Sequence, residues 1–167
     1  MPQMQKSHIK QLDATDRHIL AVLENNARAT YVEIANKVGL SQTPCTERIR
    51  RLERDGFIES YQARLNPDLV GRGFTVFMQV TFVDSTNATF DQFTDEMDKI
   101  DEVVECHMIA GGYDCLLKIR VADMDAYRKL LIDKISEIAG IAQTNSYPVI
   151  EVIKRRGNLL MTAQDDT

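Results

Sequence analysis

The chain has 167 residues and a net charge of −5, with 44% hydrophobic and 27% charged residues, which is ordinary for one folded domain or two small ones. No stretch approaches the ~18 apolar residues of a membrane span, and the polar start MPQMQKSHIKQLD is not a secretory signal, so we expect a cytoplasmic protein without a membrane partner. The cysteines Cys45, Cys106 and Cys115 are odd in number and widely placed, which favours reduced thiols over a disulfide framework.

Charge is unevenly distributed along the chain. Residues 1–66 hold ten Lys and Arg against eight Asp and Glu, whereas residues 67–167 hold ten against seventeen. A slightly basic front and an acidic back indicate two modules with different partners. The segment NPDLVGRGF concentrates one proline and two glycines, and we expect it to be the hinge between the modules.

The first module shows three short amphipathic helices in succession. Their predicted N-caps are Asp13, Thr30 and Ser41. Gly39 is expected to end the second helix and Gly56 the third, because glycine readily adopts the positive φ of a helix terminus. The turn between the second and third helices is therefore very short. Residues 56–66 then favour one or two short strands.

The second module alternates strand and helix patterns. Strands are predicted at residues 74–82, 103–111, 114–121 and 144–153. Apolar residues at helical spacing mark two helices: Phe90, Phe93, Met97 and Ile100 in the first, and Tyr127, Leu130, Leu131 and Ile138 in the second. The order βαββαβ predicts a ferredoxin-like fold, with two helices on one face of a four-stranded antiparallel sheet. Pro148 indicates that the last strand is an edge strand.

A two-residue turn at Gly112 and Tyr113 predicts the register of the two middle strands. One side of this hairpin is then wholly apolar, and on the other side Glu105 meets Arg120 as an opposite-charge pair. The register also separates Cys106 from Cys115 by roughly 13 Å, too far for a disulfide or a shared metal.

No catalytic constellation follows from this register. His107 falls on the opposite face from Cys106, so a thiol–imidazole pair is not expected. The chain has no nucleotide-binding glycine loop and no defensible pair of catalytic carboxylates. We therefore expect neither an enzyme nor a metal or cofactor.

The third helix, residues 42–55, has a basic exposed face. Its inward residues are Cys45, Ile49 and Leu52, and its outward residues are Thr43, Thr46, Glu47, Arg50 and Arg54, flanked by Arg48 and Arg51. Arginine-rich helix faces are common and most are simply solvated. Here, however, a short capped helix and a tight turn precede the basic helix, which indicates a helix-turn-helix whose third helix enters the major groove. The small positive charge of this module predicts salt-sensitive binding that needs several modules together.

Five segments in order resemble the leucine-responsive regulatory protein (Lrp/AsnC) family of bacterial transcription regulators: LDATDRHIL, EIANKVGLSQTPCTERIRRLERDGFI, ARLNP, ECHMIAGGYDCLLKIRVADMDAYRKLL and SYPVIEV. The resemblance covers about residues 12–156 and is closest to the leucine-responsive branch. It implies an α+β protein with an N-terminal winged helix-turn-helix and a C-terminal ferredoxin-like, ACT-like ligand-sensing domain that builds dimers and higher assemblies. The expected organisation is an arm at 1–11, a winged helix-turn-helix at 12–65, a hinge at 66–74, an effector-binding and oligomerisation domain at 75–156 and a tail at 157–167.

On this resemblance the helix-turn-helix spans about Tyr31 to Arg50, and double-stranded DNA is the expected partner. The candidate DNA contacts are Tyr31, Ser41, Gln42, Thr43, Thr46, Glu47, Arg48, Arg50, Arg51 and Arg54.

The glycine turn of the second module is a candidate amino-acid site. Exposed backbone N–H groups can bind a carboxylate, and a neighbouring aspartate can hold an ammonium group, although such a turn alone is more often an ordinary hairpin. The resemblance implies an effector pocket between neighbouring dimers for leucine or another small aliphatic amino acid. Its candidate residues are Gly111, Gly112, Tyr113, Asp114, Met124, Tyr147 and Val149. The chain departs from the family pattern at Gly112, Cys115 and Pro148, which leaves the effector open.

The sheet face opposite the helices is predicted to form a homodimer. Phe77, Ile109 and Leu116 lie on that face, and an isolated domain would expose them to water. The leading hypothesis is a sequence-specific, nucleoid-associated DNA-binding regulator whose assembly or DNA affinity shifts with an amino acid. The alternatives are an architectural DNA-wrapping protein without effector response, and a small metabolic enzyme or allosteric subunit.

Overall fold

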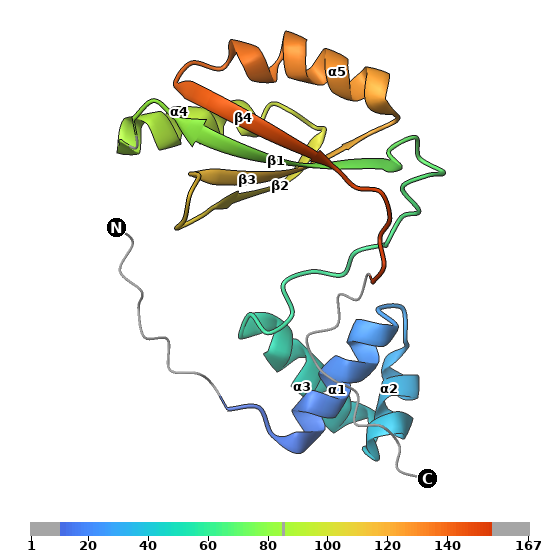
Figure 1. Cartoon of the computed structure of the whole chain (residues 1–167). Coiled ribbons are helices and arrows are strands. Elements are labelled where there is room, and N and C mark those ends of the chain that lie inside the picture. The colour runs from blue at the N-terminus through green and yellow to red at the C-terminus, as the bar shows by residue number, and fades with distance from the viewer. Residues whose placement is uncertain (1–10, 85, 155–167) are drawn as a thin grey trace. The chain divides into compact units, whose positions relative to one another are not determined.

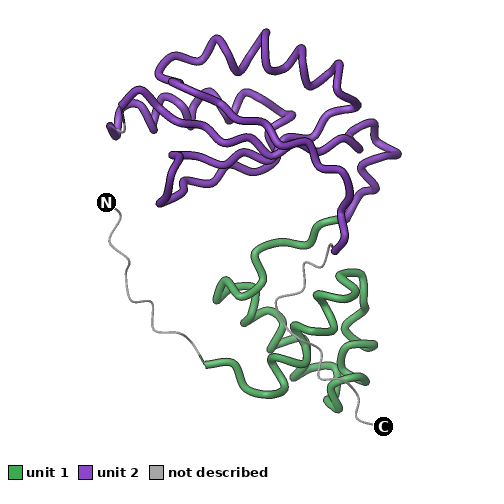
Figure 2. Tube along the Cα trace, in the orientation of Figure 1, with its two compact units in different colours: residues 1–63, 155–167 green, residues 64–154 purple. Residues whose placement is uncertain are grey.

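The computed structural model describes residues 11–84 and 86–154. Of these, residues 11–63 form one compact unit and residues 64–154 form a second (Figure 2). The predicted arm and tail lie outside the described residues, apart from Gln11. No helix of the described ranges is long and apolar enough to cross a membrane.

The first unit consists of three helices: α1 (Ala14–Asn25), α2 (Tyr31–Val38) and α3 (Gln42–Arg54) (Figure 1). Asp13 caps α1 and Thr30 caps α2, and each forms a capping box in which the third helical residue reaches back to the backbone N–H of the cap. Ser41 occupies the predicted N-cap position of α3, but its side chain accepts no capping hydrogen bond from the described residues. Gly39 and Gly56 have φ of 70° and 80°, as their places after helix ends require.

One apolar core holds these three helices together. Every helix contributes, since the fully buried members include Ile19 of α1, Ile34 of α2 and Ile49 of α3. Cys45 and Leu52, predicted to face inward, are also fully buried. The core confirms the predicted inward face of α3.

The segment after α3 differs from the prediction. Residues 57–66 form no strand with any described part of the chain, although one or two strands were expected there. Phe57 and Ile58 instead pack against the helical core, and the N–H groups of both donate to the carbonyl of Leu52. An extended segment needs a partner strand to form a ladder, and the described residues of this chain provide none. Residues 57–66 therefore follow the recognition helix as a wing would, but they form no paired strands within the described residues.

The second unit is a four-stranded antiparallel sheet with helices on one face (Figure 1). Its elements are β1 (Phe74–Phe82), α4 (Asn87–Met97), β2 (Val103–Met108), β3 (Cys115–Val121), α5 (Met124–Asp133), a short 3-10 turn (Ile135–Glu137) and β4 (Ile141–Pro148). The strand order β2-β3-β1-β4 confirms the predicted ferredoxin-like arrangement and places β2 and β4 at the edges.

The core of the second unit lies between the sheet and its helices. Alternate residues of β1 and β3 are buried, and α4 packs Phe90 and Phe93 edge-on against Phe82. Tyr127 of α5 hydrogen-bonds Ser146 of β4 on the same side. The two helices therefore cover β1 and its neighbours, whereas edge strand β2 is exposed over nearly all its length.

The predicted hairpin register is wrong by two residues. Glu105 pairs with Lys118 rather than Arg120, and Cys106 with Leu117. The hairpin loop is longer than the predicted two residues, because the N–H of Ile109 donates to the carbonyl of Asp114 at 2.8 Å. From Glu105 to Met108 a shift of two leaves each side chain on its predicted face, so the apolar pattern could not distinguish the two registers there. An irregularity between Val103 and Glu105 changes the pairing at the start of β2.

The corrected register also changes the expected separation of two thiols. Met108 lies opposite Cys115, so Cys106 is a diagonal neighbour of Cys115 across the two strands. The predicted four-residue separation along the strands is therefore wrong.

Two element ends also differ from prediction. α5 ends at Asp133, and Ile138 reaches the core through the short 3-10 turn instead of through the helix. β4 begins earlier than expected and ends at Pro148, although the N–H of Val149 still donates to the carbonyl of Thr75 on β1. The apolar residues that suggested a longer strand, Ile150 and Ile153, are exposed.

Candidate nucleic-acid interface and effector surface

The turn between α2 and α3 presents α3 on the surface of the first unit. Gly39 adopts a left-handed conformation, and the N–H of Leu40 donates to the carbonyl of Ala35 at 2.9 Å, so the chain reverses within a few residues. Leu40 packs on the core and Ser41 begins the next helix. This local geometry is that of a helix-turn-helix.

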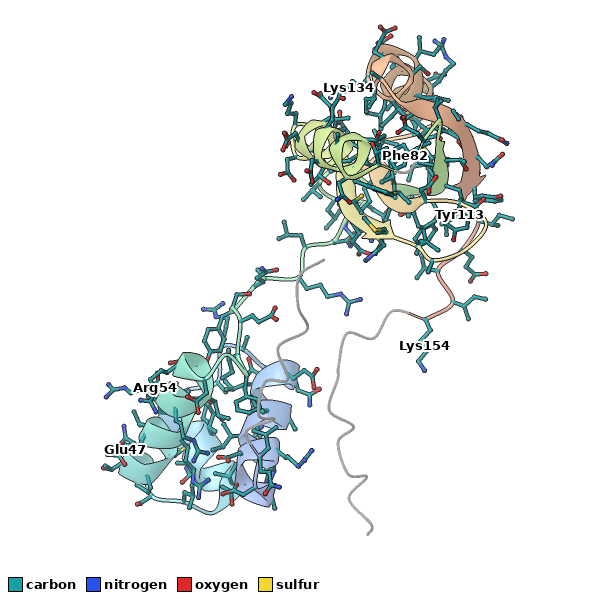
Figure 3. The ribbon with its side chains drawn as sticks, turned by 90° about the vertical axis from the view of Figure 1, so that its left-hand side faces the viewer. Glu47, Arg54, Phe82, Tyr113, Lys134 and Lys154 are labelled. Carbon is teal, nitrogen blue, oxygen red and sulfur yellow. The ribbon has the colours of Figure 1, made fainter. Side chains whose placement is uncertain are left out.

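The outward face of α3 holds most of the predicted DNA contacts. The exposed members are Ser41, Gln42, Thr43, Glu47, Arg50 and Arg54, and Tyr31 at the start of α2 is 40% exposed. Glu47 and Arg54 point away from the body of the unit in Figure 3. The Thr46 hydroxyl donates to the carbonyl of Gln42 at 2.9 Å and is half-buried. α3 therefore offers small polar side chains near its start and arginines towards its end.

The four arginines of α3 fall into two pairs. Arg48 bonds Asp13 at 2.6 Å and Asp16 at 2.8 Å, and Arg51 bonds Asp16 at 2.5 Å. Arg50 is exposed, and Arg54, also exposed, lies 3.8 Å from the carboxylate of its neighbour Asp55. The first pair ties α3 to the start of α1, and the second faces solvent.

Asp16 is the centre of the link between α1 and α3. Its carboxylate is almost fully buried and accepts hydrogen bonds from both Arg48 and Arg51. Hydrogen bonds from the Asp16 backbone and from Arg48 lower the pKa of Asp13. In turn, hydrogen bonds to the carboxylates of Asp13 and Asp16 raise the pKa of Arg48. By its place in the sequence, Asp16 is an acidic residue in the first turn of α1, where it favours the positive end of the helix. The ion pairs join residues more than 30 positions apart, which no local pattern reveals.

The arginines also border a shallow depression of about 530 Å³ on the surface of α3. It is lined by Pro44, Glu47, Arg48, Arg50, Arg51 and Arg54. Guanidinium groups donate in a planar fork that matches phosphate oxygens and the edge of guanine. The depression is thus suited to an anion or to the edge of a nucleic-acid duplex.

The predicted effector residues lie at two separate ends of the sheet. Asp114 is at one end, where its N–H donates to the carbonyl of Val80 and its carboxylate accepts from the N–H of Phe82 at 2.8 Å. Tyr113, labelled in Figure 3, belongs to the same loop as Gly111 and Gly112. Neither glycine adopts a positive φ. The carboxylate of Asp114 thus secures the end of β1.

The other predicted effector residues lie towards the opposite end. The N–H of Val149 donates to the carbonyl of Thr75 at 2.9 Å, and Met124 begins α5 just beyond the end of β3. Tyr147 is paired with Phe77 between the two ends. The five residue steps from Thr75 to Val80 span about 17 Å of strand. One chain therefore does not bring the predicted effector residues into a single pocket.

The open face of the sheet carries the predicted dimer residues in a polar surround. Phe77, Leu116 and Ile109 are half-buried. Glu105 and Lys118 form an ion pair of 2.5 Å on this face, and hydrogen bonds to Lys118 and His107 lower the pKa of Glu105. The face is thus amphipathic, with an apolar strip beside a charged pair.

Within the two described ranges, no cluster of three or more His, Cys, Asp or Glu side chains has an arrangement that would hold a metal ion.

Comparisons with known proteins cover nearly the whole chain. Residues 12–59 match the winged helix-turn-helix DNA-binding model, and residues 75–159 match the Lrp/AsnC ligand binding domain. The leucine-responsive regulatory protein of Escherichia coli strain K12 is 43% identical over 152 residues, which are 91% of this chain and 93% of that protein.

Two similar solved structures contain L-methionine. A transcriptional regulator from Neisseria meningitidis in complex with L-Met is 33% identical, with a TM-score of 0.85 over 89% of this chain and 96% of that one. A feast or famine regulatory protein from M. tuberculosis complexed with L-methionine is 30% identical, with a TM-score of 0.79 over 90% and 100%. Because a domain model matches each unit and the relatives align almost end to end, this chain belongs to the Lrp/AsnC family of DNA-binding transcriptional regulators, which are not enzymes.

Proposed function

We propose that α3 enters the major groove of double-stranded DNA and that Arg50 and Arg54 supply its main charged contacts. Arg48 and Arg51 then have a different task, because Asp16 and Asp13 hold them against α1. They orient α3 and add positive potential to its surface. The observation that carries this proposal is the division of the four arginines between the core link and the exposed face.

The second part of the proposal concerns the effector. We infer that the sheet unit binds leucine or another small aliphatic amino acid, as the methionine-bound relatives suggest, in pockets shared between subunits. The loop around Asp114 supplies N–H groups and a carboxylate, and Met124 and Val149 of another subunit supply an apolar wall. The distance between these groups in one chain supports a shared pocket.

Sharing requires association of subunits. The open sheet face with Phe77, Ile109 and Leu116 is the proposed dimer interface, and further contacts between dimers would complete the effector pockets. Two recognition helices related by a two-fold axis suit a pseudo-palindromic DNA site. Such an assembly would act in the cytoplasm, on the nucleoid.

The DNA contacts are tested by replacing Arg50 and Arg54 together with alanine. Fluorescence anisotropy would use duplexes that the wild-type protein selects from a random pool. Each arginine that reads a base or a phosphate contributes about 1–3 kcal/mol, so the double variant should bind at least about thirtyfold more weakly. The dependence of affinity on salt should become shallower as well.

A matched control removes the same charge from the other unit. Arg128 and Lys129 are exposed on α5, and replacing both with alanine should leave DNA affinity nearly unchanged. Circular dichroism and thermal unfolding establish that both variants are folded. Equal DNA affinity of the Arg50/Arg54 variant and the wild type would refute the assignment of α3.

The shared pocket is tested by mixing subunits. Asp114→Ala and Met124→Ala variants should each fail to bind the amino acid by calorimetry. Refolding the two together should restore binding at those pockets that combine an intact loop with an intact wall. If mixing restores nothing while each variant remains an oligomer, the pocket lies within one chain.

A second candidate function remains, an architectural DNA-wrapping protein without effector response. The bond between Asp114 and the N–H of Phe82 favours it, because that carboxylate already has a structural partner. Thermal shift with each of the twenty amino acids separates the two. Stabilisation by one or a few of them supports the regulator, and stabilisation by none supports the architectural protein.

A further inference from the structure

Four sulfur-containing side chains line one cavity beside edge strand β2. The cavity has a volume of about 450 Å³ and is bordered by α4, β2 and β3. Met97 comes from the last turn of α4, Cys106 and Met108 from β2, and Cys115 from β3. The recognition helix contributes nothing to its lining.

The cavity is open to solvent because the helices do not extend over β2. Cys106 and Met108 lie on the helix side of the sheet, yet both are exposed, and Met108 is 68% exposed. Cys115 also lines the cavity but is buried, at a position where the chain departs from the family pattern. A small solute can thus reach a thiol that is otherwise part of the core.

The two thiols are close, but their backbone positions suit an inserted ion better than a disulfide. Cys106 lies opposite Leu117 and Cys115 opposite Met108, so the cysteines are diagonal neighbours that share a hydrogen bond. Diagonal neighbours have Cβ atoms about 7 Å apart or somewhat less, whereas a disulfide requires about 4 Å. An S–S bond would require the strands to shift.

Two acidic residues also line the cavity. They are Asp98, the C-cap of α4, and Glu105 of β2, whose carboxylate is paired with Lys118. Asp98 therefore adds negative charge at the cavity, which favours cations.

We propose that this sulfur-lined cavity binds a soft monovalent cation of the Cu(I) or Ag(I) class, with Cys106 and Cys115 as thiolate ligands and Met97 and Met108 as thioether ligands. Thiolate and thioether sulfur select such ions. A zinc site needs further His, Cys or carboxylate ligands, and the described residues provide no such cluster. Each thiol that binds the ion releases its proton to solvent, so no electron transfer is required.

The test uses the reduced full-length protein under anaerobic conditions. Ag(I), and Cu(I) supplied as its bicinchoninate complex, are titrated against the wild type and against a Cys106→Ser/Cys115→Ser variant. The wild type should take up one ion per chain in competition with the chelator, and the variant should lose this uptake. Replacing Met97 and Met108 together with leucine should weaken binding severalfold. Cys45→Ala is the matched control and should bind as the wild type does, since Cys45 lies in the core of the other unit.

Alkylation of the wild type gives an answer that does not depend on the folding of any variant. With Ag(I) present, mass spectrometry should find Cys106 protected from a maleimide reagent, and without Ag(I) it should be labelled. Uptake that persists in the Cys106/Cys115 variant, or Cys106 labelling unaffected by Ag(I), would overturn the proposal. Neither result bears on DNA binding by α3.

Discussion

The two units of this chain differ in how completely one subunit builds its candidate site. In the first unit, Thr43, Arg50 and Arg54 lie on one exposed face of one short helix. In the second unit, the loop at Asp114 and the apolar residue Val149 are attached to opposite ends of β1. Each strand end is well fixed, but the pocket they would form is not present in one chain.

This difference indicates which of the two sites depends on the association of subunits. A helix-turn-helix can present its side chains as soon as its own small core has formed. A pocket assembled from opposite strand ends requires a second sheet placed beside the first. Effector binding and subunit assembly are then coupled, since a ligand that binds only the assembled form stabilises it.

The largest expected effect comes from disrupting the proposed dimer interface on the open sheet face. Such a change should abolish association through the second unit and leave the fold of the first unit intact. Phe77→Asp places a charge in the proposed dimer interface, so sedimentation should show monomers. DNA affinity should fall by about 10²–10⁴ through loss of avidity, although α3 is unchanged. Val83→Asp, at a position 74% exposed on the same chain, should leave the assembly intact. A Phe77→Asp protein that still dimerises would place the interface elsewhere.

A smaller loss is expected in the first unit alone. Asp16→Asn keeps the shape of the side chain and removes the charge that holds Arg48 and Arg51. The free energy of unfolding of this unit should fall by about 2 kcal/mol, because a buried carboxylate with charged partners is lost. Hydrogen exchange should show the loss in α1 and α3 and not in the sheet.

The control for that experiment is Asp125→Asn, an exposed acidic residue in the first turn of α5. Its effect should stay within about 0.5 kcal/mol. Equal effects of the two substitutions would mean that Asp16 acts only as a helix-start charge.

The ion pair of the sheet should show a still smaller coupling. A double-mutant cycle on Glu105 and Lys118 should give an interaction of about 0.5–1 kcal/mol, as expected for a partly exposed pair. The corresponding cycle on Glu105 and Arg120 should give none. Coupling to Arg120 instead of Lys118 would restore the register predicted from the sequence.

The smallest effect concerns the pH dependence of the first unit. Hydrogen bonds from the Asp16 backbone and from Arg48 lower the pKa of Asp13 in the folded state. A lowered folded pKa means that the stabilisation is present above the unfolded value of about 3.9 and is lost as pH falls through the folded value. Asp13→Asn retains a capping oxygen but does not titrate. Urea midpoints measured between pH 7 and pH 3 should therefore fall less steeply for this variant than for the wild type.

The sequence predicted most of the fold because local signals agreed with burial. Thr30 is the predicted N-cap of α2 and forms a capping box with Glu33, Gly39 ends α2, and β1 has its predicted ends. These features depend on neighbouring residues, so a linear pattern contains them. The ends of β4 and α5 were less well predicted, because Ile150 and Ile153 are apolar without being buried and Ile138 is buried without being helical.

The sites were harder to predict because they depend on contacts between distant residues. The link from Asp16 to Arg48 and Arg51 joins two helices, and each charge had an adequate local explanation. The proximity of Cys106 and Cys115 depended on a hairpin register that the apolar pattern left undetermined by two residues. The placement of Asp114 and Val149 at opposite ends of β1 required the complete sheet.

The bonds from Asp16 to Arg48 and Arg51 have a consequence for the thermodynamics of DNA recognition. Two arginine side chains that would otherwise rotate freely are already fixed when the protein folds, and α3 is held to α1 by them. Ordering a flexible side chain at an interface costs about 0.5–1.5 kcal/mol. For Arg48 and Arg51 this conformational entropy is lost during folding and not on binding to DNA. The recognition helix is therefore preorganised when it enters the groove.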